Sequence, residues 1–189
     1  MNKLYQIALI SAVVVSLSGC VTAMVGATAV GISAATDSRT IGTQIDDTTL
    51  EVRVIAALKG ESRLDSSRIK VVAFNGAIVL LGQVPEQGLN ALAAKIARDS
   101  RGVVRVHNEL RVQEVISLAT ISNDAWLTSR IKTKLLADER VDAAKVKLLT
   151  ENSEVFLLGL IDAEQAAAAV ELARNTNGVS KVVDAFEIQ

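Results

Sequence analysis

The sequence predicts an α+β protein of two tandem domains, each a three-stranded mixed sheet packed on two helices. One observation is an internal repeat, since residues 70–82 and 147–159 match at a constant offset of 77 residues. A repeat of this length is a domain-sized unit. The other observation is the order of the hydrophobic patterns, which is helix, strand, strand, helix, strand in both copies. A strand, a helix and a returning strand favour a right-handed crossover, so both helices are expected on one face.

An export signal is predicted before the repeats. Residues 1–3 carry a positive charge and residues 4–17 are apolar, a run too short to span a bilayer. Leu17-Ser-Gly-Cys20 then resembles the lipobox of bacterial lipoproteins, in which the signal is cut just before an acylated cysteine. We therefore expect a signal peptide at residues 1–19 and a covalent acyl and diacylglycerol lipid on Cys20. The alternative is an ordinary signal with an incidental cysteine.

The segment that follows Cys20 is rich in Ala, Gly, Ser and Thr. Such a composition has little side-chain volume to bury and is costly to order, so residues 20–45 are expected to form a flexible tether. A second membrane element is the rival interpretation, but the apolar run is shorter than about 18 residues. The resemblance to bacterial lipoproteins implies that Val21, in place of Asp, favours sorting to the outer membrane.

The first domain is expected at residues 46–112. Asp47 precedes apolar residues at helical spacing, which predicts that it caps a helix ending at Gly60. Asn75-Gly76 between two apolar runs predicts a type I′ hairpin turn. Pro85 suits the first turn of a second helix. The expected strands are residues 69–74, 78–81 and 104–112, and the second helix ends near Ser100 with Gly102 just beyond it.

The second domain is expected at residues 123–189, with the same order of elements. Asp124 is the expected cap of its first helix, and Asp162 with Gln165 resembles a capping box at the start of the second. The linker, residues 113–122, is too apolar for a free spacer. We therefore expect the two domains to touch.

Composition argues against several classes of function. The 189 residues include one cysteine and one histidine, and the formal net charge is -1. No Cys/His metal set can be assembled, no cofactor is expected, and there is no global excess of positive charge for nucleic acid. His107 lies in a strand pattern without a nucleophile motif, so a structural role is favoured. We expect no enzymatic activity.

The two copies resemble BON domains, the bacterial osmotic-shock and nodulation domains. The resemblance is carried by Ile78-Val-Leu-Leu-Gly82 and Val155-Phe-Leu-Leu-Gly159, and by Gly102-Val103 and Gly178-Val179 before the last strand of each copy. With the lipobox, the chain is similar to the dual-BON outer-membrane lipoproteins associated with cell division and envelope stress. The resemblance implies binding of anionic phospholipid (phosphatidylglycerol or cardiolipin) through the first helix of the second copy, and a role in envelope integrity.

A mismatch between the copies points to the same helix. Trp126, the only tryptophan, aligns with Thr49, so an obligatory core position is excluded and the indole is expected to be exposed or at an interface. At 100° per residue, Arg130 and Lys134 share its side of the helix. Aromatic rings and cations together suit the headgroup level of an anionic membrane. The candidate lipid-contact residues are Trp126, Leu127, Arg130, Lys132 and Lys134.

Two alternatives remain open for this surface. Trp126 could pack between the two domains, while the neighbouring cations form an ordinary solvated face. The protein would then be a scaffold that contacts outer-membrane assembly or cell-wall-remodelling factors.

Overall fold

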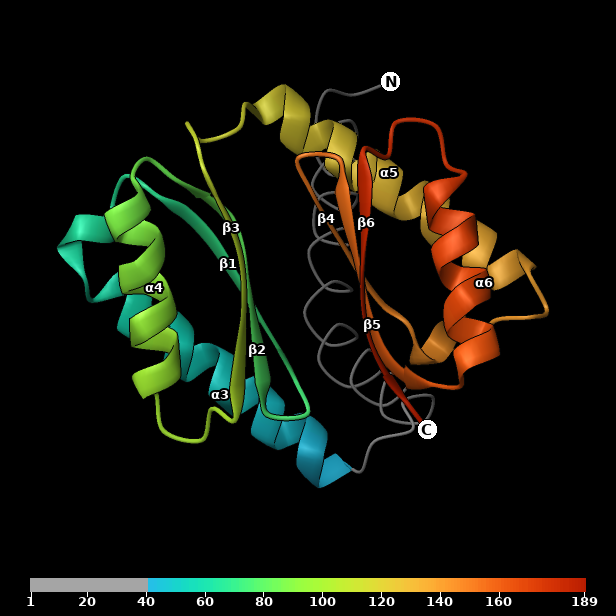
Figure 1. Cartoon of the computed structure of the whole chain (residues 1–189), viewed down its shortest axis with the longest axis horizontal. Helices are drawn as coiled ribbons and strands as arrows, with labels where there is room; N and C mark the ends of the chain where they lie inside the picture. Colours follow the sequence, from blue (N-terminus) through green and yellow to red (C-terminus); the bar gives the residue numbers. More distant parts are fainter. Residues whose placement is uncertain (1–40) are drawn as a thin grey trace, which may run out of the picture. The chain divides into compact units, whose positions relative to one another are not determined.

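The computed structural model describes residues 41–189, which form two copies of one arrangement (Figure 1). Within these residues no helix combines the length and the apolar character needed to cross a bilayer. Cys20, the signal and most of the expected tether lie outside the described residues. The first copy contains α3 (Ile41–Lys59), β1 (Arg68–Phe74), β2 (Ala77–Val84), α4 (Gln87–Asp99) and β3 (Arg105–Val112). The second contains α5 (Leu118–Ala137), β4 (Lys147–Glu151), β5 (Glu154–Ile161), α6 (Ala163–Arg174) and β6 (Lys181–Ile188).

Each copy builds a three-stranded mixed sheet. The strand order is β1-β2-β3 in one sheet and β4-β5-β6 in the other. The hairpin strands pair antiparallel, and the last strand of each copy returns parallel to the middle one after its helix. This arrangement confirms the predicted α+β class and the mixed sheets.

The two helices of each copy cover the same face of its sheet. In the first copy, Val54 from α3, Leu80 from β2 and Ala97 from α4 belong to one buried cluster. In the second copy, Ile131 from α5 and Leu157 from β5 occupy the corresponding cluster with residues of α6. Burial of the valine, leucine and isoleucine side chains contributes roughly 1.5–3 kcal/mol each, so the helix-facing side of each sheet is the main core.

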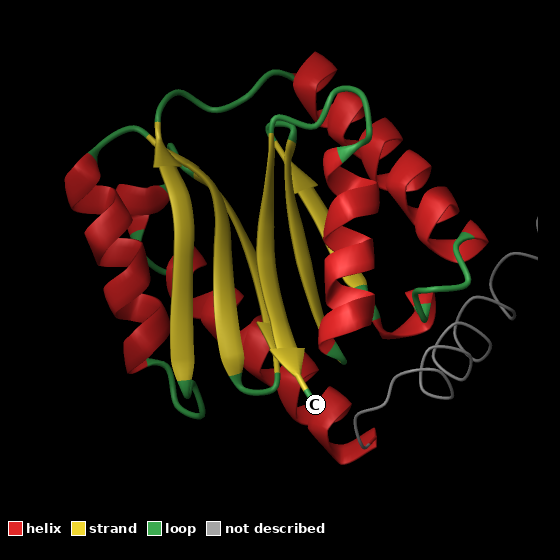
Figure 2. Cartoon of the chain, turned by 45° about the vertical axis from the view of Figure 1, so that its right-hand side comes forward, coloured by secondary structure: helices red, strands yellow, loops and turns green. Residues whose placement is uncertain are grey.

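The opposite face of each sheet packs on the other copy. Val72, Phe74, Val79 and Leu81 of the first sheet form one buried cluster with Phe156 and Leu158 of the second. Both sheets therefore bury two faces, which explains why every residue of β2 is buried. Figure 2 shows the two sheets side by side with helices on their outer sides. The prediction that the copies touch is confirmed, but they touch through their sheets rather than through the linker.

A glycine two residues before the end of each central strand is required by a close backbone approach. A Cβ on Gly82 would lie 1.9 Å from the carbonyl oxygen of Arg68, and one on Gly159 would lie 2.3 Å from that of Lys145. Atoms cannot approach so closely, and Gly82 also has a φ of +122°. The glycine of the repeated Leu-Leu-Gly sequence is therefore required because neighbouring backbone lies against it in both copies.

The hairpin turn of the first copy has the predicted conformation, and the turn of the second copy has similar φ values. Asn75 and Gly76 have φ values of 53° and 73°, as a type I′ turn requires. Asn152 and Ser153 have φ values of 51° and 62°, so a serine takes the left-handed position that glycine holds in the first copy. A non-glycine residue at such a φ is strained and needs support from its surroundings.

The turns are supported by two aspartates, Asp47 and Asp124, which were predicted from the sequence to be helix caps. The helices begin earlier than predicted, at Ile41 and Leu118, and the side chain of Ser117 caps the second by accepting from the Thr120 amide. The prediction that Asp47 and Asp124 are N-caps is wrong. Both lie within helices, are buried, and accept hydrogen bonds from both amides of the hairpin turn in their own copy. Residues 41–45 and 118–122, expected in the tether and the linker, are helical.

Candidate functional site

The candidate site lies on the outer side of α5. The side chain of Trp126 is 53% exposed, and the guanidinium of Arg130 lies 5.0 Å from the centroid of its ring. This is cation–π geometry, which keeps the cation beside the indole. Trp126, expected to be exposed or at an interface, is exposed, and the alternative that it packs between the two domains is wrong.

The other predicted contact residues have different positions. Leu127 is 0% exposed, because the next helical position points into the core; the prediction that it contacts lipid is wrong. Lys134 is partly buried, and its ammonium group donates to the carbonyl of Asn175 and the hydroxyl of Thr176 at the end of α6. Its charge thus complements the C-terminus of that helix. Lys132 is exposed.

Two exposed leucines extend this surface, and the sequence interpretation missed both. Leu118 and Leu136 are 81% and 77% exposed. They are separated by five turns of helix, so they lie on one line about 27 Å long, with Trp126 about 80° around the axis from it. Leu118 was missed because it was assigned to the linker; a Ser-x-x-Thr cap at residues 117–120 was the signal that α5 begins there.

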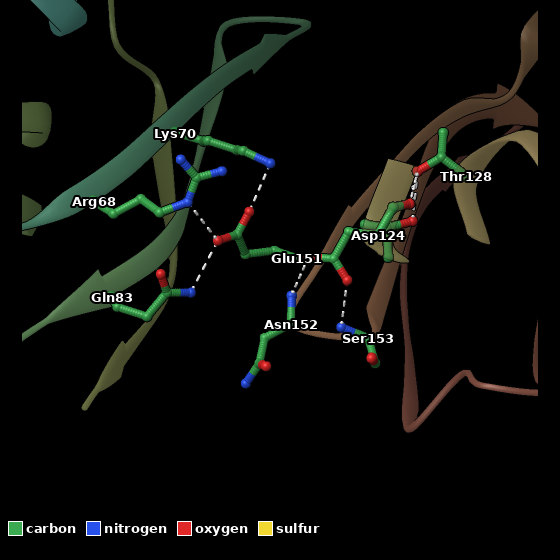
Figure 3. Close-up of polar contacts among 9 residues, drawn as sticks. Arg68, Lys70, Gln83, Asp124, Thr128, Glu151, Asn152 and Ser153 are labelled. Carbon is green, nitrogen blue, oxygen red and sulfur yellow. Dashed lines mark hydrogen bonds and ion pairs between the residues drawn. The ribbon is translucent and has the colours of Figure 1, made fainter. Parts of the chain in front are cut away.

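The inner side of α5 is attached to the β4–β5 hairpin (Figure 3). The two carboxylate oxygens of Asp124 accept from the amides of Asn152 and Ser153, each at 2.8 Å. One turn later, the hydroxyl of Thr128 donates to that of Thr150 at 2.8 Å. These bonds hold the turn with its strained serine, and they fix the half of α5 that carries Trp126 to the sheet.

The residue before that turn, Glu151, reaches the first copy (Figure 3). Its carboxylate, almost fully buried, lies 2.6 Å from the ammonium of Lys70, 3.1 Å from Nε of Arg68 and 2.9 Å from the amide nitrogen of Gln83. Burial raises the pKa of Glu151, but the hydrogen bonds from Lys70 and Gln83 and the nearby Arg68 lower it further, so the net shift is downward. The carboxylate therefore stays ionised at neutral pH.

Further polar contacts join the copies, mostly with cations from the first and carboxylates from the second. Arg111, near the end of β3, pairs with Glu154 beside the second hairpin at 2.6 Å, and this hydrogen bond raises the pKa of Arg111. Conversely, Glu187 near the end of β6 accepts from Asn75 in the first hairpin at 2.7 Å. The last strand of each copy thus contacts the hairpin of the other.

The site shows binding features rather than a catalytic constellation. Among residues 41–189 there is no group of three or more His, Cys, Asp or Glu side chains arranged to hold a metal ion. His107, for which a structural role was expected, is exposed on β3. The outer side of α5 carries an aromatic ring with a stacked cation and two exposed leucines.

Comparisons with known proteins agree with the duplication. The BON domain model matches residues 46–114 and again residues 123–189. The chain is 42% identical over 188 residues to outer membrane lipoprotein DolP of Haemophilus influenzae, covering 99% of this chain and 97% of that protein. It is 46% identical over 148 residues to a 21 kDa hemolysin of Actinobacillus pleuropneumoniae, covering 78% and 76% of the two chains. Osmotically-inducible protein Y of Escherichia coli is 32% identical over 145 residues, covering 75% and 72%.

Proposed function

This chain belongs to the BON-domain family, and we propose that it is an outer-membrane lipoprotein that binds anionic phospholipid through α5. A lipid on Cys20 anchors it, the folded body faces the periplasm, and the binding supports envelope integrity. The anchored location is supported by a relative named as an outer membrane lipoprotein, which is similar to this chain along nearly its whole length.

The observation that carries the lipid proposal is the exposed Trp126 with Arg130 stacked on it. An indole has an apolar body and one polar N–H, so it partitions to the headgroup level of a bilayer. A cation near an anionic surface gains roughly 1 kcal/mol, and Arg130 is held beside the ring that inserts.

The length of α5 enlarges the contact. Leu118 and Leu136 place apolar side chains at its two ends, and Lys132 adds an exposed cation between them. Each contact is weak alone, but a lipid anchor holds the body at a high effective concentration of membrane, so weak contacts suffice.

Vesicle co-sedimentation tests this function. The mature chain, residues 20–189 with Cys20→Ser to remove the anchor, is mixed with phosphatidylglycerol-containing or pure phosphatidylcholine vesicles. We expect binding to the anionic vesicles that weakens with salt, and a loss of at least fivefold for Trp126→Ala and for Arg130→Gln. The matched controls are Thr49→Ala and Arg53→Gln, the equivalent positions of the first copy, which should bind as wild type. Equal binding by all four variants would refute the assignment to α5.

A protein-interaction scaffold is the second candidate, and α3 favours it. Ile45 and Val52 are both more than half exposed and lie two turns apart on one side of that helix. A partner protein with an apolar surface could cover them. A photo-reactive residue in place of Ile45 should then give a discrete cross-linked protein in intact cells, whereas cross-links to lipid alone would count against a scaffold.

A further inference from the structure

The first copy has a surface pocket, lined mostly by polar residues, at the place where the second copy carries Trp126 and Arg130. Its volume is about 420 Å³, within the range of small-molecule sites. It lies between one flank of α3, the β1–β2 hairpin and the loop after α4. The lining residues used below are Asp46, Thr49, Arg53, Gly76 and Gly102.

Arg53 provides a fixed positive charge in this pocket. Its guanidinium donates to the carbonyl oxygen of Arg101, and within the described part of the chain it forms no ion pair with a carboxylate. Gly102 lies beside this guanidinium with a φ of +95°, a conformation that residues with a side chain rarely adopt. An arginine held in place with unused N–H donors is suited to a phosphate group.

Asp46 provides the opposite charge on the same flank. It precedes Arg53 by seven residues, which is two turns and about 10 Å along the helix axis. Its carboxylate is exposed and has no hydrogen bond or ion pair to any residue from 41 to 189. The neighbouring Asp47 differs, because its carboxylate is bonded to the hairpin amides of Asn75 and Gly76. A carboxylate beside a phosphate site disfavours a bare phosphate dianion and favours a ligand that also carries a cation.

The second copy lacks this pair of charges. Asn123 replaces Asp46, and Trp126 replaces Thr49. The cation is retained as Arg130, but it stacks on the indole. The pocket with separated charges is therefore a property of the first copy, and it does not depend on the surface proposed for α5.

We propose that this pocket binds a phosphoethanolamine group, with its phosphate on Arg53 and its ammonium on Asp46. This group carries one negative and one positive charge, which match Arg53 and Asp46. The pocket volume of about 420 Å³ is large enough to hold it. Either the headgroup of phosphatidylethanolamine or a soluble phosphoethanolamine ester supplies this chemistry.

NMR titration of the ¹⁵N-labelled chain, residues 20–189 with Cys20→Ser, tests the site. O-phosphoethanolamine should shift the amides of Thr49, Arg53, Gly76 and Gly102 in a saturable manner, and inorganic phosphate should bind at least fivefold more weakly. Asp46→Asn should remove this preference, because it loses the ammonium partner while keeping the shape. Arg53→Gln should remove the binding of both probes. Trp126→Ala is the matched control and should leave both titrations unchanged.

Three results would overturn the proposal: equal affinity for phosphoethanolamine and inorganic phosphate in the wild type, no effect of Asp46→Asn, or shifts centred on α5. Nanodiscs then distinguish the source of the group. A preference for phosphatidylethanolamine over phosphatidylcholine, whose quaternary ammonium cannot donate a hydrogen bond to Asp46, supports the lipid headgroup. Saturable binding of the soluble ester without this preference supports a free ligand.

Discussion

The two copies are alike inside and different on one outer flank. In both, a buried aspartate of the first helix accepts from the two amides of the hairpin turn, and all four of these bonds are 2.8 Å long. On the exposed flank of the same helix, Thr49 of the first copy corresponds to Trp126 of the second, and Asp46 corresponds to Asn123. Because the scaffold is shared, such differences identify the surfaces on which the copies have specialised.

The contact between the copies shows a second difference. Lys70 and Arg68 meet a carboxylate at Glu151, whereas the equivalent of Glu151 in the first copy is Phe74, in the apolar cluster. The inner faces are therefore not interchangeable.

Removal of either hairpin aspartate should destabilise the protein most. Asp47→Ala and Asp124→Ala each leave two amides without a charged acceptor, and we expect a loss of about 3–5 kcal/mol in the free energy of unfolding. Urea denaturation at neutral pH measures it. Asp46→Ala, an exposed neighbour, should change stability by less than about 0.5 kcal/mol. A loss below about 1 kcal/mol for one aspartate would contradict the view that both copies depend on the same clamp.

Substitutions at two adjacent positions of α5 should affect different properties, namely stability at Leu127 and vesicle binding at Trp126. Leu127→Ala should lower the free energy of unfolding by about 3 kcal/mol, because it opens a cavity in the core, and Leu50→Ala should do the same in the first copy. Trp126→Ala should leave stability almost unchanged while it weakens vesicle binding. Thermal unfolding and co-sedimentation of the same samples separate the two effects. A normal unfolding midpoint for Leu127→Ala would be inconsistent with its buried position.

Substitution of Glu151 should weaken the contact between the copies. We expect Glu151→Ala to cost about 2–3 kcal/mol. That is below the value for a fully buried pair, because the side chain of Lys70 is 40% exposed and can regain water. Glu151→Gln keeps the size of the side chain and removes its charge, so its effect on stability measures the contribution of the charge.

The pH dependence of this loss follows from the lowered pKa of Glu151. A carboxyl group whose pKa falls on folding stabilises the protein above its unfolded value of about 4.5, and the contribution is lost as the pH falls through the folded value. The difference in stability between the wild type and Glu151→Gln should therefore be constant from pH 7 to pH 5 and shrink below pH 4.5. Denaturation at each pH measures it, and a difference that grows toward acid would contradict the assignment.

Transfer of the tryptophan should have the smallest effect on stability. Thr49→Trp places an indole on the exposed flank of α3 beside Arg53, and we expect a change of less than about 0.5 kcal/mol in unfolding free energy. The graft should raise the affinity for anionic vesicles by up to about fivefold, or about 1 kcal/mol. It should also abolish phosphoethanolamine binding by filling the pocket. Unchanged vesicle binding would show that an indole and a cation alone do not make the contact.

The sequence predicted the strands and turns well because their signals are local. Asn75-Gly76 requires a tight hairpin, and the alternation of the last strands needs no distant partner to be recognised. The start of the first helix in each copy was predicted wrongly for a physical reason, whereas Asp162 caps α6 as expected. An aspartate before an apolar repeat resembles a cap, and nothing local reveals that Asp124 bonds a turn 28 residues away. The Ser117 cap was visible in the sequence but lay inside an assumed linker.

The site was predicted in part. The exposure of Trp126 followed from its alignment with Thr49, a comparison that needs only the repeat. The burial of Leu127 followed from helical spacing too. It was nevertheless included among the candidate lipid-contact residues because it is next to Trp126 in the sequence. Glu151 could not be predicted as a centre of contacts, because its partners belong to another copy and their approach depends on how the two sheets pack.

The last strand of each copy contacts the hairpin of the other, and these contacts affect how the two halves of the chain assemble. Arg111 and Glu187 are equivalent positions of the repeat, yet they carry opposite charges and each meets the hairpin of the other copy. A symmetric dimer of identical domains would have to place the same side chain at both positions. Fusion into one chain removes that restriction and makes the encounter of the halves intramolecular. The protein thus gains the specificity of a heterodimer while its assembly is independent of its own concentration.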